Sequence, residues 1–140
     1  MAILGGAGNV AGSNPAGTGS GLNYIGEHAY AYSGMFVPAT STYTMLSFTT
    51  GSGYLLSEII VTGATDAVNP GNGGVSTFVV SLDGIEVMRL KTDTDQEDMP
   101  ANAVVPFLIP PYTKVEITGI DTVTTAERKT SANIVGRVYI

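Results

Sequence analysis

The stretch VSTFVVSLDGIEVMRLK, residues 75–91, decides the fold class of this chain. Two β-rich runs flank Asp83-Gly84, and an Asp-Gly pair between such runs predicts a two-residue β-hairpin, because its type I′ turn needs positive φ at both central residues. Alternate residues share a face of each strand: Phe78, Val80 and Leu82 on the first, and Ile85 and Val87 against Glu86 and Met88 on the second. One face of the hairpin is therefore expected in a core and the other partly in water.

The rest of the chain supplies more strands of the same kind. They are predicted at residues 24–37, with a bend at Ser33-Gly34, and at 43–50, 54–62, 103–109, 112–119 and 131–140. The run 54–62 is β-branched and apolar, which favours a central place in a sheet. Pro106 indicates that 103–109 is an edge or bulged strand. About eight strands without an amphipathic helix predict an all-β, antiparallel β-sandwich, and two long connections favour a jelly roll over an immunoglobulin-like sandwich.

The first 21 residues differ from the rest in composition. They contain seven glycines among Ala, Ser and Asn, and bury too little apolar surface to offset the entropy of ordering. Residues 1–21 are therefore predicted to be an extended N-terminal arm, and residues 22–140 a single domain. Ile3, Leu4 and Val10 could anchor the arm on a neighbouring subunit; a disordered tail or flexible linker is the alternative. No basic segment precedes an apolar run, so a secretory signal is not expected.

The composition disfavours several classes of partner. Charged residues make up 13% of the 140 residues, against about 25% in an average soluble domain. The net charge is −6 and only six residues are Lys or Arg, which disfavours nucleic acid and anionic membranes. There is no cysteine, which excludes disulfides, thiolate catalysis and Cys-based zinc sites. No apolar stretch approaches the ~20 residues that span a bilayer.

Two features of the sequence are candidates for sites of chemistry. The loop TDTDQED, residues 92–98, carries four carboxylates, but it lacks the glycine and the distal glutamate of a calcium-binding EF-hand loop. A solvated rim loop is the simpler interpretation. His28 is the single histidine, so no second imidazole could share a metal with it. We therefore assign no catalytic, cofactor-binding or metal-binding residue, and no cofactor.

The tyrosines are the better candidates for binding. Tyr24, Tyr30 and Tyr32 lie in the first predicted strand, where His28, Tyr30 and Tyr32 share a face. Tyrosines on strands can dock a protein partner or stack on a sugar, although they are also common at the rim of a core. We expect Tyr24, Tyr30 and Tyr32, together with the three arm anchors, to contact a partner.

A cysteine-free, weakly charged all-β domain behind a glycine-rich arm resembles the minor structural proteins of tailed bacteriophages, particularly capsid decoration (cement) proteins. The phrases SLDGIEVMRLK and FLIPPYTKVEITGI are similar to phrases in such virion proteins, and the likeness covers residues 51–140 in style and the arm in composition. It implies a homo-oligomer, often a trimer, that binds the major capsid protein on the virion surface after synthesis in the host cytoplasm. A phage tail or fibre component, or a carbohydrate-binding module, is the alternative.

Overall fold

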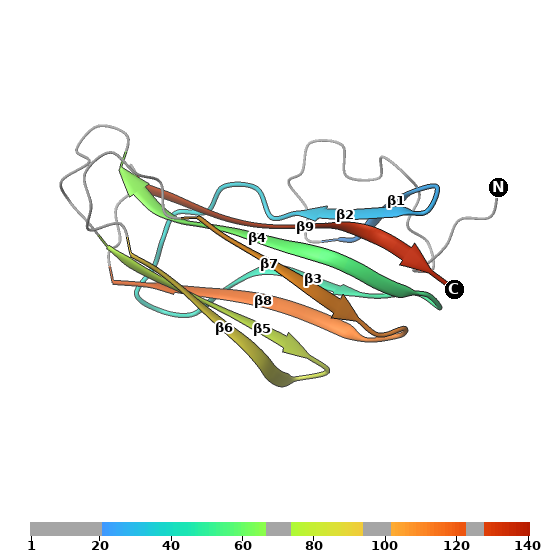
Figure 1. Cartoon of the computed structure of the whole chain (residues 1–140). Helices are drawn as coiled ribbons and strands as arrows, with labels where there is room; N and C mark the ends of the chain where they lie inside the picture. The colour runs from blue at the N-terminus through green and yellow to red at the C-terminus, as the bar shows by residue number, and fades with distance from the viewer. Residues whose placement is uncertain (1–20, 67–73, 94–101, 123–127) are drawn as a thin grey trace.

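The computed structural model describes residues 21–66, 74–93, 102–122 and 128–140. These residues form two antiparallel β-sheets that pack face to face as a sandwich, and both layers are seen edge-on in Figure 1. The strands are β1 (Asn23–Ile25), β2 (His28–Tyr32), β3 (Tyr43–Thr49), β4 (Tyr54–Asp66), β5 (Val75–Leu82), β6 (Ile85–Asp93), β7 (Asn102–Ile109), β8 (Lys114–Asp121) and β9 (Arg128–Tyr139). Apart from Gly21, the predicted arm lies outside the described residues.

The strands pair as a nested set. β2 pairs with β9, β3 with β8, β4 with β7 and β5 with β6, all antiparallel. The sheet orders are β1-β2-β9-β4-β7 and β3-β8-β5-β6. Nested pairs distributed alternately over two sheets are the jelly-roll arrangement, in which one long antiparallel ribbon wraps around a single core. The predicted jelly-roll sandwich is confirmed, and β1 extends one edge of its five-stranded sheet.

The hairpin at residues 83 and 84 forms as predicted. Asp83 has φ 50° and Gly84 has φ 82°, the two positive values of a type I′ turn. Phe78 and Val80 are fully buried and pair with Leu90 and Met88.

The predicted alternation of Ile85 and Val87 with Glu86 and Met88 is broken in the second strand of the hairpin. The register of β5 and β6 shifts between Val80 and Ser81, where a β-bulge inserts Val87. Ile85 pairs with Leu82 at the tip of the hairpin and stays 69% exposed, while Val87 is also exposed. Met88 and Leu90 instead pack against the core. The bulge changes which residues of the second strand face inward.

The single strand predicted at residues 24–37 is in fact a second hairpin. Gly26, with φ 59°, begins a turn after Ile25, and the chain returns as β2. Positive φ at the first central residue alone is typical of a type II′ turn, which glycine permits. This extra turn explains why the described residues form nine strands rather than about eight. The predicted alternation survives in β2, where Ala29 and Ala31 are buried.

The side-chain alternation expected of the strand predicted at 43–50 is broken by a second bulge. The register of β3 against β8 shifts between Thr44 and Leu46, so Met45 and Leu46 are both buried. Strict alternation would have placed one of them in water. In the neighbouring strand β8 the alternation is regular, and Val115 and Ile117 both face the core.

The predicted centre and edge of the larger sheet are confirmed. β4 lies between β9 and β7, and β7, which carries Pro106, is the last strand of the five-stranded sheet. Proline donates no backbone hydrogen bond, so an edge is where a sheet tolerates it best. The core between the two sheets is apolar, and its largest fully buried side chains include Phe78, Leu46 and Ile59.

A buried polar cluster connects the two sheets at one end of this core. The Tyr43 hydroxyl on β3 donates a hydrogen bond to Asp121 on β8 and lies 3.0 Å from the hydroxyl of Thr130 on β9. Ser76 on β5 also donates to Asp121. Gly119 leaves room for the Tyr43 ring, since a Cβ there would lie 2.8 Å from its Cζ atom. Four strands therefore share one satisfied network around a buried carboxylate.

Candidate interaction surface

The outer face of the five-stranded sheet is unusually apolar for an exposed surface. The register places Leu108, Leu56, Arg137, His28 and Ile25 in one row across all five strands. We define the apolar sheet face as the exposed large hydrophobic side chains on this side of the sheet: Ile25, Tyr32, Tyr54, Leu56, Val104, Leu108 and Tyr139. Contiguous exposed apolar surface of this kind is typical of a binding site.

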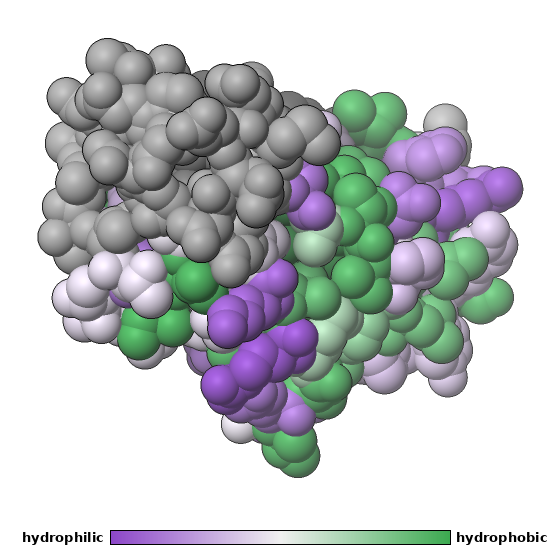
Figure 2. All heavy atoms as spheres, turned by 60° about the vertical axis from the view of Figure 1, so that its left-hand side comes forward, coloured by the Kyte–Doolittle hydropathy of each residue, from purple (hydrophilic) through white to green (hydrophobic). Residues whose placement is uncertain are grey.

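The outer face of the four-stranded sheet is different. Its outward positions are mainly Ser, Thr and charged residues, including the ion pair between Lys114 and Glu116, with 3.0 Å between nitrogen and oxygen. The exposed large hydrophobic side chains on the strands of this sheet are fewer: Ile85, Val87 and Ile120, which is 38% exposed. Figure 2 shows one side of the molecule, where apolar side chains gather in a band between hydrophilic ones. The outer face of the five-stranded sheet is therefore the more apolar of the two.

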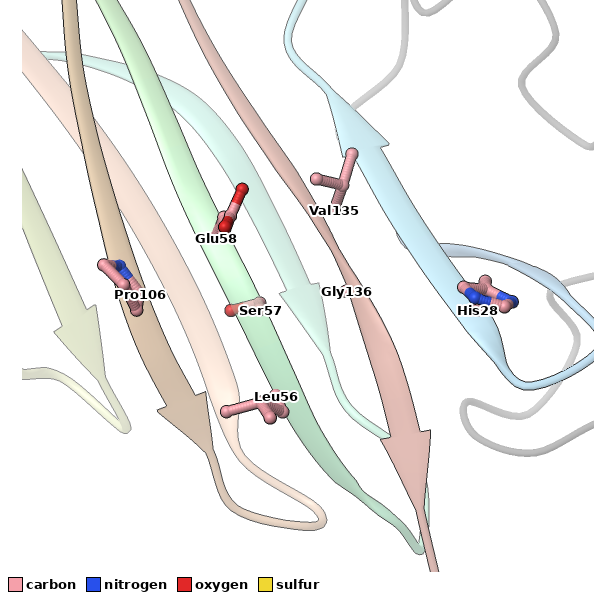
Figure 3. Close-up of a pocket in the computed structure, with 7 residues that line it drawn as sticks. All are labelled: His28, Leu56, Ser57, Glu58, Pro106, Val135 and Gly136. Carbon is pink, nitrogen blue, oxygen red and sulfur yellow. The ribbon is translucent and has the colours of Figure 1, made fainter.

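A shallow open depression lies within the apolar sheet face. Its volume is about 480 Å³, and its lining comes from four strands, β2, β4, β7 and β9 (Figure 3). Leu56, Pro106 and Val135 give it an apolar floor and walls, and His28 and Glu58 are its ionisable groups. Gly136 lets β9 run close to β4 at this point. A Cβ at Gly136 would lie 2.4 Å from the carbonyl oxygen of Leu56.

The charged side chains on this face are exposed, and Arg137 is paired. Arg137 and Glu27 form an ion pair with 2.5 Å between nitrogen and oxygen, and the Arg137 guanidinium lies 5.4 Å from the centre of the Tyr139 ring. The hydrogen bond from Arg137 to Glu27 raises the pKa of Arg137. Exposed pairs of this kind contribute little to stability because water and salt screen them. Glu58 is a further exposed charge on this face, beside Leu56 and Pro106.

The structure separates the three tyrosines predicted to contact a partner. Tyr24 is 2% exposed and belongs to the core, so its ring packs inside the domain. Tyr30 is half-buried, and Tyr32 is exposed on the apolar sheet face. Their ring centres are 5.2 Å apart, so they form one aromatic patch on β2. The other expected contacts, Ile3, Leu4 and Val10, lie outside the described residues.

The residues weighed for chemistry do not come together. His28 is exposed on the outer face of β2, away from the buried Asp121. Within the described ranges there is no group of three or more His, Cys, Asp or Glu side chains that could hold a metal ion. Most of the acidic loop, residues 94–98, lies outside those ranges. The same part of the chain contains no helix long and apolar enough to cross a membrane.

Sequence reasoning missed the residues that dominate this surface. Leu56 was included in an apolar run that was expected in the centre of a sheet, and Leu108 in an apolar edge strand. Glu58 lies two residues after Leu56 and therefore on the same face of β4. Its charge was the available signal that this face meets solvent. Which neighbours share that face depends on the register of β4 with β7 and β9, which the sequence does not show.

Comparison of the sequence with protein-family models gives no match, and comparison with curated proteins gives none either.

Proposed function

We propose that this chain is a non-enzymatic virion structural protein of the capsid decoration type. In this proposal it self-associates, binds the major capsid protein on the outside of a phage head and stabilises the shell. The observation that carries the proposal is the apolar sheet face, because a soluble monomer rarely exposes seven large hydrophobic side chains on one side of one sheet.

The contrast between the two outer faces indicates which face of the domain would contact the shell. The apolar sheet face would lie against the shell, where its hydrophobic side chains leave water. The hydroxyl-rich and charged face of the four-stranded sheet would point to solvent. A low content of Lys and Arg and a net charge of −6 disfavour attachment through packaged nucleic acid.

The fold alone does not choose this function. Jelly rolls occur in viral capsid proteins, in lectins and in cupins. Cupin-type chemistry needs ligands inside the sandwich, whereas the interior described here is packed with Phe78, Leu46, Ile59 and similar side chains. The surface indicates an interaction partner, and the resemblance to phage decoration proteins is the reason for proposing a virion. A tail or fibre component would use the same kind of face.

A lectin-like module is the second candidate, and the depression in Figure 3 favours it. His28 and Glu58 could hydrogen-bond sugar hydroxyls there, with Tyr30 beside them in the register. The depression is open and mainly apolar, which suits part of a protein interface better than a sugar.

The test compares two substitutions that differ only in the face they modify. Leu56→Asp places a carboxylate on the apolar sheet face, and Ile120→Asp places one on the outer face of the other sheet. Phage heads lacking the protein are incubated with each purified variant, and occupancy is measured after gradient sedimentation. Leu56→Asp should lower the affinity at least tenfold, equivalent to about 1.4 kcal/mol, while Ile120→Asp should bind like wild type.

Equal binding by wild type and Leu56→Asp would show that the apolar sheet face is not the attachment surface. A wild-type protein that never copurifies with particles, yet binds an immobilised oligosaccharide, would replace the proposal with the lectin-like candidate. Circular dichroism of both variants checks that they are folded.

A further inference from the structure

The edge strand β7 lacks the features by which β-proteins protect a sheet edge. Its eight residues, NAVVPFLI, contain no charged side chain, and Val104 and Leu108 are exposed on its outer side. Long, apolar, uncharged edges pair readily with another strand because their outward N–H and C=O groups have no partner in the sheet. Pro106 interrupts the edge at one position only.

The other edges of the described sandwich are less suited to pairing. β6 carries the exposed Glu86, Arg89 and Lys91, and the first two form an ion pair. β1 has only three residues. β3 has no charge, but its exposed residues, such as Thr44 and Thr49, are polar. β7 is therefore the edge that combines length, neutrality and exposed apolar side chains.

The sheet order relates this edge to the N-terminal segment. Residues 1–20 lead through Gly21 and Leu22 into β1, which is the opposite edge of the same sheet from β7. The two edges are four strand spacings apart, about 19 Å at ~4.8 Å per spacing. The segment contains no Asp, Glu, Lys or Arg, so it matches β7 in lacking charge. Twenty residues can extend up to about 66 Å.

We infer that β7 is a strand-addition site for residues 1–20 of a second copy of this chain. When two copies lie side by side, the β1 edge of one faces the β7 edge of the next, and the segment enters directly as an added strand. To reach its own β7, the segment would have to cross the whole outer face and then turn along the edge. The inference rests on the proposed function, which requires self-association.

The contact is heterologous, because one copy supplies the segment and the other supplies the edge. Such contacts close into rings when the rotation between copies allows it. A ring of this kind is compatible with the expected trimer. Backbone hydrogen bonds would supply the affinity, and exposed Val104 and Leu108 would contact small apolar side chains of the segment.

The absence of native cysteine permits a direct test by disulfide trapping. One preparation carries Val104→Cys, and a second carries a single cysteine in place of Ala7, Val10 or Ser13. The two are mixed under mild oxidation, and covalent heterodimer is measured on a non-reducing gel. Thr49→Cys on the uncharged edge β3 is the matched control acceptor. At least one of the three mixtures with Val104→Cys should give tenfold more heterodimer than the same mixture with Thr49→Cys.

Three results would overturn the inference. Equal trapping on β7 and β3 would show no preference for the edge. Covalent homodimer from Val104→Cys alone, without trapping to the segment, would show that two β7 strands pair with each other. An intramolecular disulfide in a chain that carries both cysteines, without any disulfide between chains, would show that the segment covers its own edge. In each case head occupancy by wild type would leave the proposed function standing, whereas a protein that neither self-associates nor binds particles would remove both.

Discussion

The hydroxyl of Tyr43 should contribute more to stability than any exposed tyrosine hydroxyl. In Tyr43→Phe, buried Asp121 keeps the hydrogen bond from Ser76 and loses the one from the phenol. A hydrogen bond to a charged group contributes about 1.5–3 kcal/mol. The Thr130 hydroxyl, which is fully buried, also loses its partner at a further cost of about 1 kcal/mol. The free energy of unfolding should therefore fall by about 2–4 kcal/mol.

Urea unfolding followed by circular dichroism measures this change, with Tyr54→Phe as the control. Tyr54 is an exposed tyrosine on β4, and loss of its hydroxyl should change the free energy of unfolding by less than about 0.5 kcal/mol. If the two variants have the same stability, the network does not hold the sheets together, and the account of Asp121 as a satisfied buried carboxylate is wrong.

The same tyrosine gives the stability a defined dependence on alkaline pH. Burial, and then the hydrogen bond to Asp121, raise the pKa of Tyr43 above its ordinary value of 10.0. The unfolded chain therefore releases this proton at a lower pH than the folded one, so the contribution is complete below pH 10 and is lost as pH rises above it. The stability difference between wild type and Tyr43→Phe should shrink from pH 9 to pH 11. A constant difference would contradict the raised pKa.

Two glycine substitutions test the backbone. Gly84→Val should lower the free energy of unfolding by more than about 1 kcal/mol; no atom lies within 4 Å of a Cβ at Gly84, so the strain comes only from its φ of 82°. Gly84→Asn should cost less, because Asn tolerates positive φ. An equal urea midpoint for Gly84→Val and wild type would refute the turn. Gly136→Ala should cost about 1–3 kcal/mol, because its Cβ would lie 2.7 Å from the Cα atom of Ser57; a variant as stable as wild type in urea would show that β9 can move away from β4.

The candidate surface was only partly accessible to sequence reasoning. Tyrosine on an alternating strand is a signal for binding, and it succeeded for Tyr32, which lies on the apolar sheet face. It failed for Tyr24, whose neighbour Gly26 turns the chain so that β1 packs Tyr24 into the core. Leu56 and Leu108 resemble core residues in the sequence, because hydrophobicity gives no information on whether a second layer covers them. Their exposure depends on how many layers the fold has.

Local chemistry explains what the sequence by itself determined. Asp83-Gly84 specifies its turn because few residues accept positive φ, Pro106 specifies an edge because it lacks an N–H group, and the alternation in β8 specifies its inner face because successive side chains point to opposite sides. These features, repeated along the chain, were sufficient to predict an antiparallel sandwich. Each depends on only a few consecutive residues.

Only the tertiary structure decided the features that depend on strand register. The bulges in β3 and β6 each insert one residue opposite a partner strand, and that residue reverses the inward face of everything beyond it. Tyr43, Asp121 and Thr130 meet only because β3, β8 and β9 converge at one end of the core. The apolar sheet face likewise exists because side chains from five strands, distant in sequence, are aligned in rows. Such alignment is a property of pairing between strands, and no single strand contains it.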